Sequence, residues 1–197
     1  YVLPEGELRE RVKKNFVTNI RKNGLQTGFF ATEHLLPLLV EAGEQKLAYD
    51  VLLQENCPGW MYQVKCGATT TWERWDALKP DGTVNEEKMA GSGENMVSFN
   101  HYAFGSVGEF YYQYILGIRP EKPGFANLHF APYPDERLGG VSGSYLSVAG
   151  KIESAWRYEP DGCHIRLATP VEAVVLLPDG RSENVPAGTY EWTVKRP

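Results

Sequence analysis

The stretch RPEKPG, residues 119–124, divides this chain of 197 residues into two parts of different character. Before it, apolar residues recur every three or four positions, which is typical of helices. After it come short runs in which apolar and polar residues alternate, which is typical of strands. The change of period predicts an α+β chain of more than one domain, with helices in residues 1–119 and a β domain in residues 120–197.

The helical part begins with a clear amphipathic stripe in residues 7–22, which stops at Asn23-Gly24. We expect Thr32 to cap a second helix, in which Pro37 marks a kink or the true first turn. A third helix is predicted over residues 44–55, and a fourth from about Asn100 to Gly117. The connecting loops are long and polar, which suits the end of a toroid of helical hairpins better than a bundle.

The β part contains two Pro-Asp-Gly turns, at residues 160–162 and 178–180, each between two alternating runs. Asp and Gly tolerate the backbone angles that hairpin turns need. These turns and runs predict an antiparallel β-sandwich.

Composition excludes several classes of function. The net charge of −5 argues against nucleic acid as a partner, because phosphate binding needs a basic surface. The longest apolar run is too short to span a membrane. Three cysteines fit no metal-ligand spacing, and we expect them to be small buried residues. His34, His129 and His164 are too scattered in the sequence to indicate a metal site, and no phosphate-binding glycine loop or nucleophile elbow is present, so no metal and no cofactor is predicted.

The segment GATTTWERWD, residues 67–76, carries the strongest sign of chemistry. On a helix, Trp72 and Trp75 would share one face, with the Glu73 carboxylate beside their rings. Aromatic rings bind the apolar faces of sugars, and charged side chains bind their hydroxyls. The segment therefore predicts either the wall of a sugar site or a charged helix end whose tryptophans pack inside.

Two further segments have similar alternatives. In SFNHYAFGSVGEF, residues 98–110, His101 either serves a substrate, by binding a hydroxyl or transferring a proton, or is a structural residue that caps a helix or lies at the edge of the core. In GLQTGFFATEHLLP, residues 24–37, an aromatic turn either lines a pocket or only connects helices.

Together these segments closely resemble the C-terminal half of bacterial α-L-rhamnosidases, glycoside hydrolase family 78. The resemblance implies the last part of an (α/α)6 barrel followed by a β-sandwich, and hydrolysis of terminal α-L-rhamnose with inversion. It assigns the role of general base to Glu73 and places His101 in the rhamnose pocket. Trp72 and Trp75 match the family motif as further sugar contacts. We expect Arg74 or another nearby cation to favour the ionised form of Glu73, and Arg74 is also a predicted substrate contact.

The resemblance also implies a partner. In the family, the general acid lies in an upstream segment that this chain does not contain. We therefore expect a fragment that needs the upstream remainder of the same barrel, acts on rhamnose-containing carbohydrate and is inactive alone. The sequence does not decide whether the protein is cytoplasmic or is periplasmic or secreted in a bacterium.

Two alternatives remain. One is a non-catalytic carbohydrate-binding or structural module, whose sandwich stacks sugars on four aromatic residues, Tyr145, Trp156, Tyr158 and Trp192. The other is a toroid enzyme that acts on a uronic or glucosyl sugar.

Overall fold

The computed structural model describes residues 4–87 and 97–196. The chain forms two compact units, residues 1–107 and 108–197, and each unit is described by itself. The domain boundary that we place at residues 119 and 120 stays a prediction.

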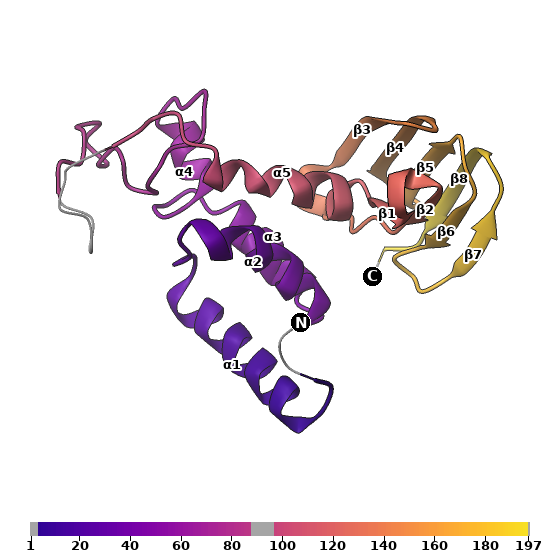
Figure 1. Ribbon diagram of the computed structural model, residues 1–197, viewed down its shortest axis with the longest axis horizontal. Coiled ribbons are helices and arrows are strands. Elements are labelled where there is room, and N and C mark those ends of the chain that lie inside the picture. Colours follow the sequence, from indigo (N-terminus) through magenta and orange to yellow (C-terminus); the bar gives the residue numbers. More distant parts are fainter. Residues whose placement is uncertain (1–3, 88–96, 197) are drawn as a thin grey trace. The chain divides into compact units, whose positions relative to one another are not determined.

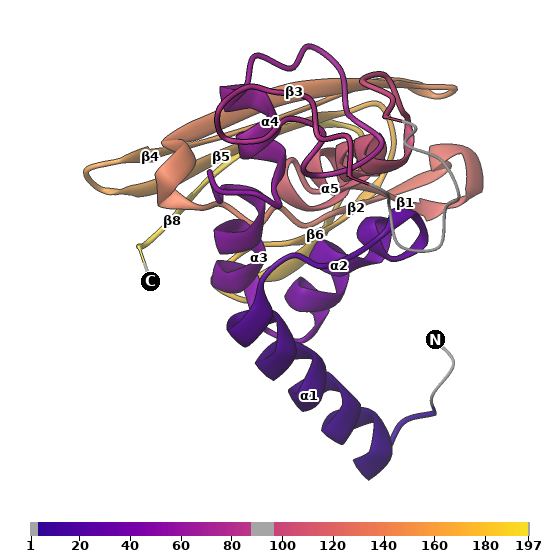
Figure 2. The ribbon, with the colours of Figure 1, turned by 90° about the vertical axis from the view of Figure 1, so that its left-hand side faces the viewer.

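The first unit is helical, as predicted (Figure 1). Its helices are α1 Glu7–Asn23, α2 Phe29–Glu41, α3 Gln45–Leu52 and α4 Trp60–Lys65. α2 and α3 lie side by side in both ribbon views (Figures 1 and 2). Their facing side chains are almost fully buried and form an apolar core of Leu35, Leu36, Leu39, Ala48 and Tyr49.

The start of α2 differs from the prediction. Thr32 lies inside the helix rather than at its cap, and its hydroxyl donates a hydrogen bond of 2.7 Å to the carbonyl oxygen of Gly28. Gly28 is the capping residue, because its extended backbone turns the chain into the helix one residue before Phe29. Pro37 lies within α2, and the short helix α4 has no counterpart among the predicted helices.

The last predicted helix is present as a continuous series of turns, in which η1 Ala103–Ser106, α5 Val107–Phe110 and η2 Tyr111–Ile115 follow one another. Its end confirms the predicted role of Gly117, which has a φ of 74°. A Cβ atom at Gly117 would lie 2.3 Å from the nitrogen of Pro132. Only glycine fits this position, for its backbone angle and for its size.

The second unit is built mainly from two four-stranded sheets, in the orders β1-β2-β6-β7 and β3-β4-β5-β8. The strands are β1 Ile118–Lys122, β2 Asn127–Phe130, β3 Gly140–Ser147, β4 Gly150–Glu159, β5 Gly162–Thr169, β6 Ala173–Leu176, β7 Ser182–Val185 and β8 Gly188–Val194. Short 3₁₀ turns, η3 Pro123–Phe125 and η4 Glu136–Leu138, connect some of them. Within the described residues, β2 and β6 are the only parallel pair of strands, which the alternating pattern alone does not predict.

The two sheets pack face to face and enclose an apolar core. The ring of Phe130 on β2 lies 6.1 Å from that of Trp192 on β8. Both predicted hairpin turns are present, with Pro160 and Asp161 between β4 and β5, and residues 177–181 between β6 and β7. The fold class predicted from the sequence, helices followed by antiparallel sheets, is confirmed.

The cysteines agree only in part with the prediction. All three are free, but Cys57 is exposed, Cys66 is partly exposed and only Cys163 is buried. Burial raises the pKa of the Cys163 thiol to about 11.

Candidate active site

Hydrogen bonds join the two chemistry-bearing segments of the first unit directly. The N–H of Glu73 donates to the carbonyl oxygen of Ser98 at 2.8 Å, and the N–H of His101 donates to that of Thr71 at 2.9 Å. The hydroxyl of Thr71 also donates to the carbonyl oxygen of His101 at 2.6 Å. Residues 71–73 and 98–101 therefore run antiparallel, side by side, although they are far apart in the sequence.

One oxygen of the Glu73 carboxylate is held by the backbone of the other segment. Its Oε2 atom accepts a hydrogen bond of 2.9 Å from the N–H of Ser98. In the part of the chain that the structure describes, Oε1 has no hydrogen-bond donor, and the side chain is partly exposed. A carboxylate fixed through one oxygen and open at the other can accept a proton from a bound water molecule.

Arg74 does not contact Glu73, contrary to our expectation. Its Nε and Nη2 atoms donate to the two carboxylate oxygens of Asp76 at 2.7 Å and 3.0 Å, and Nη1 donates to the carbonyl oxygen of Glu87 at 2.7 Å. Asn85 adds a bond of 2.8 Å to Asp76. Arg74 lowers the pKa of Asp76, because its guanidinium fork donates two hydrogen bonds to that carboxylate. Its role in binding substrate stays a prediction.

The two tryptophans do not share a helical face, because residues 71–80 form turns and extended segments. Trp72 is 3% exposed and packs in a cluster with Tyr62 and Ala77. Burial of Trp72 favours packing as its main role, and its contact with sugar stays a prediction.

Trp75 belongs to a different set of contacts. Its ring stacks on that of Phe104 at a centroid distance of 3.7 Å, with the edge of Trp60 5.0 Å away. Its Nε1 donates to the carbonyl oxygen of Thr27 at 2.9 Å. One ring face of Trp75 is therefore occupied by Phe104.

The imidazole of His101 lies between two aromatic rings. It stacks on Phe29 at 4.6 Å and on Tyr102 at 5.1 Å. The N–H of Ala103 donates to Nδ1 at 3.3 Å, so the neutral ring carries its proton on Nε2. Among residues 4–87 and 97–196, Nε2 has no hydrogen-bond partner and can donate to a ligand.

These rings form one aromatic row, in the order Trp75, Phe104, Phe29, His101 and Tyr102. Phe104 and Phe29 connect its two halves, with centroids 5.6 Å apart. Tyr102 is 88% exposed at one end. Phe29 comes from the segment 24–37, so this segment lies beside His101. Phe29 and Phe104 are not among the site residues predicted from the sequence. The only signal for them is that each stands in one of the aromatic segments already considered.

The remaining histidines have carboxylate neighbours instead. His34 lies on α2 beside Glu33, His129 pairs with Glu121 and His164 pairs with Asp161. In the described residues, no group of three or more histidine, cysteine, aspartate or glutamate side chains could hold a metal ion. None of the helices described is both long and apolar enough to cross a membrane.

The aromatic platform considered for the sandwich is not formed. Trp156 is 2% exposed and its Nε1 donates to the carbonyl oxygen of Ile115 at 2.7 Å, so it belongs to the core. Tyr145 packs against Phe125 and Tyr112 instead. Tyr158 lies under the guanidinium of Arg196. The strand register places all four aromatic residues on the inner face of their sheet, so their rings are taken up by packing within the chain.

Comparison with known proteins agrees with this architecture in both units. The family model described as bacterial alpha-L-rhamnosidase 6 hairpin glycosidase domain matches residues 1–115, and that of the bacterial alpha-L-rhamnosidase C-terminal domain matches residues 117–190. The chain belongs to the bacterial α-L-rhamnosidase family.

Individual relatives show the same likeness to α-L-rhamnosidases. An alpha-L-rhamnosidase of Streptomyces avermitilis is 35% identical over 82% of this chain. The crystal structure of the native enzyme from Aspergillus terreus superimposes with a TM-score of 0.87 at 34% identity, over 97% of this chain. That of the Streptomyces avermitilis enzyme, complexed with L-rhamnose, gives a TM-score of 0.86 at 31% identity, over 95% of this chain.

This rhamnosidase-family chain spans only part of those proteins. It covers 15% of the curated Streptomyces relative, and 22% and 20% of the two solved chains. The family predicted from the sequence is confirmed, whereas the roles of Glu73, His101, Trp72, Trp75 and Arg74 stay predictions.

Proposed function

We propose that this chain supplies the general base and one wall of the sugar pocket of an inverting α-L-rhamnosidase. The single observation that carries the proposal is the pairing of residues 71–73 with residues 98–101. This pairing holds the Glu73 carboxylate and the His101 ring on two adjacent segments. A proton acceptor and a hydrogen-bond donor beside an aromatic row suit a sugar and the water molecule that attacks it.

In the proposed reaction, the open Oε1 of Glu73 removes a proton from a water molecule as that water attacks the anomeric carbon. A second carboxylic acid protonates the leaving oxygen on the opposite face of the sugar. Inverting enzymes hold these two groups about 6.5–9.5 Å apart, which leaves room for the water. We assign the acid to another part of the catalytic barrel.

The aromatic row positions the sugar in this proposal. The ring stack of Phe29, His101 and Tyr102 offers an apolar surface, and Nε2 of His101 donates to a sugar hydroxyl. Phe104 and Trp75 continue the row on the other side of Phe29. Arg74 and Asp76 fix the loop that carries Glu73, and so position the base without contacting it.

Rhamnose as the sugar is supported by the family and by the Streptomyces avermitilis structure, whose title describes a complex with L-rhamnose. The isolated 197 residues should hydrolyse rhamnosides far more slowly than a chain with the whole barrel. Loss of a general acid alone typically costs about 10²–10⁴-fold in rate.

The test follows the product by proton NMR while the complete product of the gene hydrolyses an aryl α-L-rhamnoside. The proposal expects the β-anomer of rhamnose to appear first, before mutarotation. The 197-residue chain, assayed alongside, should release little product. First appearance of the α-anomer would show retention and contradict the role of base. Absence of any rhamnose release by the complete protein would contradict the substrate.

A further inference from the structure

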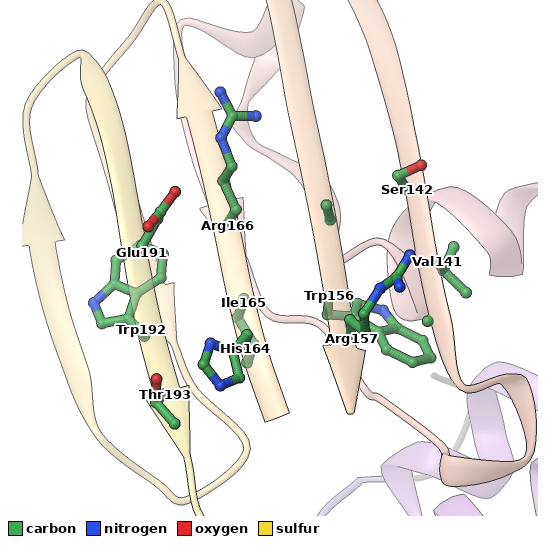
Figure 3. A pocket seen from close by; sticks show the side chains of 12 residues that line it. Val141, Ser142, Trp156, Arg157, His164, Ile165, Arg166, Glu191, Trp192 and Thr193 are labelled. Carbon is green, nitrogen blue, oxygen red and sulfur yellow. The ribbon is translucent and has the colours of Figure 1, made fainter. Parts of the chain in front are cut away.

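The sheet β3-β4-β5-β8 carries a hollow of about 450 Å³ on one face (Figure 3). None of the residues predicted for the rhamnose site lines it, whereas Trp156 and Trp192, which were considered for sugar stacking, do. Polar and charged side chains from all four strands line it, among them Ser142, Arg157, His164, Arg166, Glu191 and Thr193. Its volume falls within the range of about 300–1,000 Å³ that is usual for small-molecule sites.

The strand register explains why a hollow forms here. Ser142, Ala155, Arg166 and Glu191 lie opposite one another in one cross-strand row, and Gly140, Arg157, His164 and Thr193 form the next row. Side chains of both rows point to the same face, because their positions differ by two along each strand. Small residues on β3 and at Ala155 therefore leave space between long charged ones.

The residues that alternate with these two rows along β4 and β5 show that the rows lie on the outer face of the sheet. Trp156 and Ile165 alternate with these rows and are 2% and 1% exposed, so they point into the sandwich core. Arg157 and His164 are exposed on the opposite face. The hollow therefore opens on the outer face of the sheet.

The charges in the hollow are weakly matched within the chain. Within residues 4–87 and 97–196, the structure gives Arg157 no ion pair and no side-chain hydrogen bond. Arg166 lies 3.6 Å from Glu153, which Lys151 holds more closely at 2.6 Å. The guanidinium of Arg157 is therefore open to an added anion, whereas Arg166 has Glu153 at 3.6 Å and Glu191 directly opposite it on β8.

We propose that this hollow binds a saccharide that carries a carboxylate group. Arg157 and Arg166 would bind the carboxylate, since guanidinium groups match its geometry through paired hydrogen bonds. Ser142, Thr193 and Glu191 would exchange hydrogen bonds with sugar hydroxyls. The hollow shares no residue with the proposed rhamnose site that Glu73 serves. The choice of a saccharide over other carboxylates rests on the proposed function.

The test measures binding to the 197-residue chain by isothermal titration calorimetry. The probes are tri-galacturonic acid, the neutral trisaccharide galactotriose and citrate. The proposal expects the acidic trisaccharide to bind, with an affinity that falls as salt rises. It should bind at least about tenfold more tightly than either other probe, because both the carboxylates and the sugar rings contribute.

Matched variants locate the site. The double substitution Arg157→Gln with Arg166→Gln should weaken binding about tenfold or more. Arg11→Gln, at an exposed arginine of α1, should leave it unchanged. Ala155→Phe keeps both arginines but fills the hollow, so it should also abolish binding. Affinities are compared only among variants whose melting temperature equals that of the wild-type chain.

Several outcomes would overturn the proposal. These are no binding to the wild-type chain, equal affinity for galactotriose or citrate, and unchanged binding in the double variant or in Ala155→Phe. The variant Glu73→Gln should bind tri-galacturonic acid normally. Failure of the rhamnosidase assay with intact acidic-saccharide binding would therefore contradict only the proposed function, and the reverse result only this inference.

Discussion

Glu73 and Ser98 hold each other through two hydrogen bonds. The N–H of Glu73 donates to the carbonyl oxygen of Ser98 at 2.8 Å, and the N–H of Ser98 donates to Oε2 of Glu73 at 2.9 Å. The side chain of Glu73 is thereby fixed to the segment that carries His101. This relationship explains how a carboxylate in a loop could be placed accurately enough for proton transfer.

Thr71 should be important for the pairing of the two segments. Thr71→Val removes the 2.6 Å hydrogen bond to the carbonyl oxygen of His101 but keeps the shape of the side chain. We expect a loss of about 1 kcal/mol in the free energy of unfolding, measured by urea denaturation. Thr69→Val, at an exposed threonine nearby, is the control. Equal effects of the two substitutions would contradict the role of Thr71.

His101 should contribute to rhamnoside hydrolysis by donating a hydrogen bond from Nε2 to the substrate. His101→Phe keeps the ring stack with Phe29 and Tyr102 but removes the donor. In the complete protein, we expect kcat/KM for an aryl α-L-rhamnoside to fall about 10–100-fold, the effect of one lost hydrogen bond to substrate. His34→Gln, at an exposed histidine of α2, should have little effect. An unchanged kcat/KM in His101→Phe would exclude a substrate contact.

Asp76 should make stability depend on pH in the acid range. Arg74 lowers the pKa of Asp76 below its ordinary value of 3.8. The stabilisation is therefore present above the unfolded pKa of about 4 and is lost as pH falls through the lower folded pKa.

The check is to compare urea unfolding of Asp76→Asn and wild type at several pH values. Because the Asp76 side chain is 47% exposed, we expect the variant to lose only about 1 kcal/mol at pH 7. The difference should shrink as pH falls well below 4. Glu86→Gln, at an exposed carboxylate in the same loop, is the control. A difference that stays constant with pH would contradict the Arg74–Asp76 account.

Gly117 should be intolerant of any side chain. Gly117→Ala adds a Cβ atom 2.3 Å from the nitrogen of Pro132, at a φ of 74°. Gly180→Ala has a similar φ of 86° but meets nothing within 4 Å. We expect about 1 kcal/mol of destabilisation for Gly180→Ala, from backbone strain alone, and several times more for Gly117→Ala. Similar melting temperatures for the two variants would contradict the close approach.

Much of the fold follows from the sequence because its signals are local. The stripe in residues 7–22, the glycine at position 117 and the Pro-Asp-Gly turns each act within a few residues, and the structure contains all of these elements. The start of α2 was misplaced because Thr32 bonds back to Gly28 as a helical threonine can, instead of capping.

The candidate site was predicted less completely because its geometry depends on long-range contacts. Helical spacing suggested a shared face for Trp72 and Trp75, but the segment is not helical and the two rings pack on different neighbours. The choice of Asp76 over Glu73 as the partner of Arg74 depends on how the loop turns. No local pattern reports that Phe29 stacks on His101 from 72 residues away.

The most direct test of the central claim compares wild type with Glu73→Gln in the complete protein, by the rate of aryl α-L-rhamnoside hydrolysis. Glutamine can still accept the hydrogen bond from Ser98, so the fold and sugar binding should persist. We expect kcat to fall about 10²–10⁴-fold with KM little changed, while Glu86→Gln retains the wild-type rate. A wild-type kcat in Glu73→Gln would contradict the assignment of Glu73 as the general base.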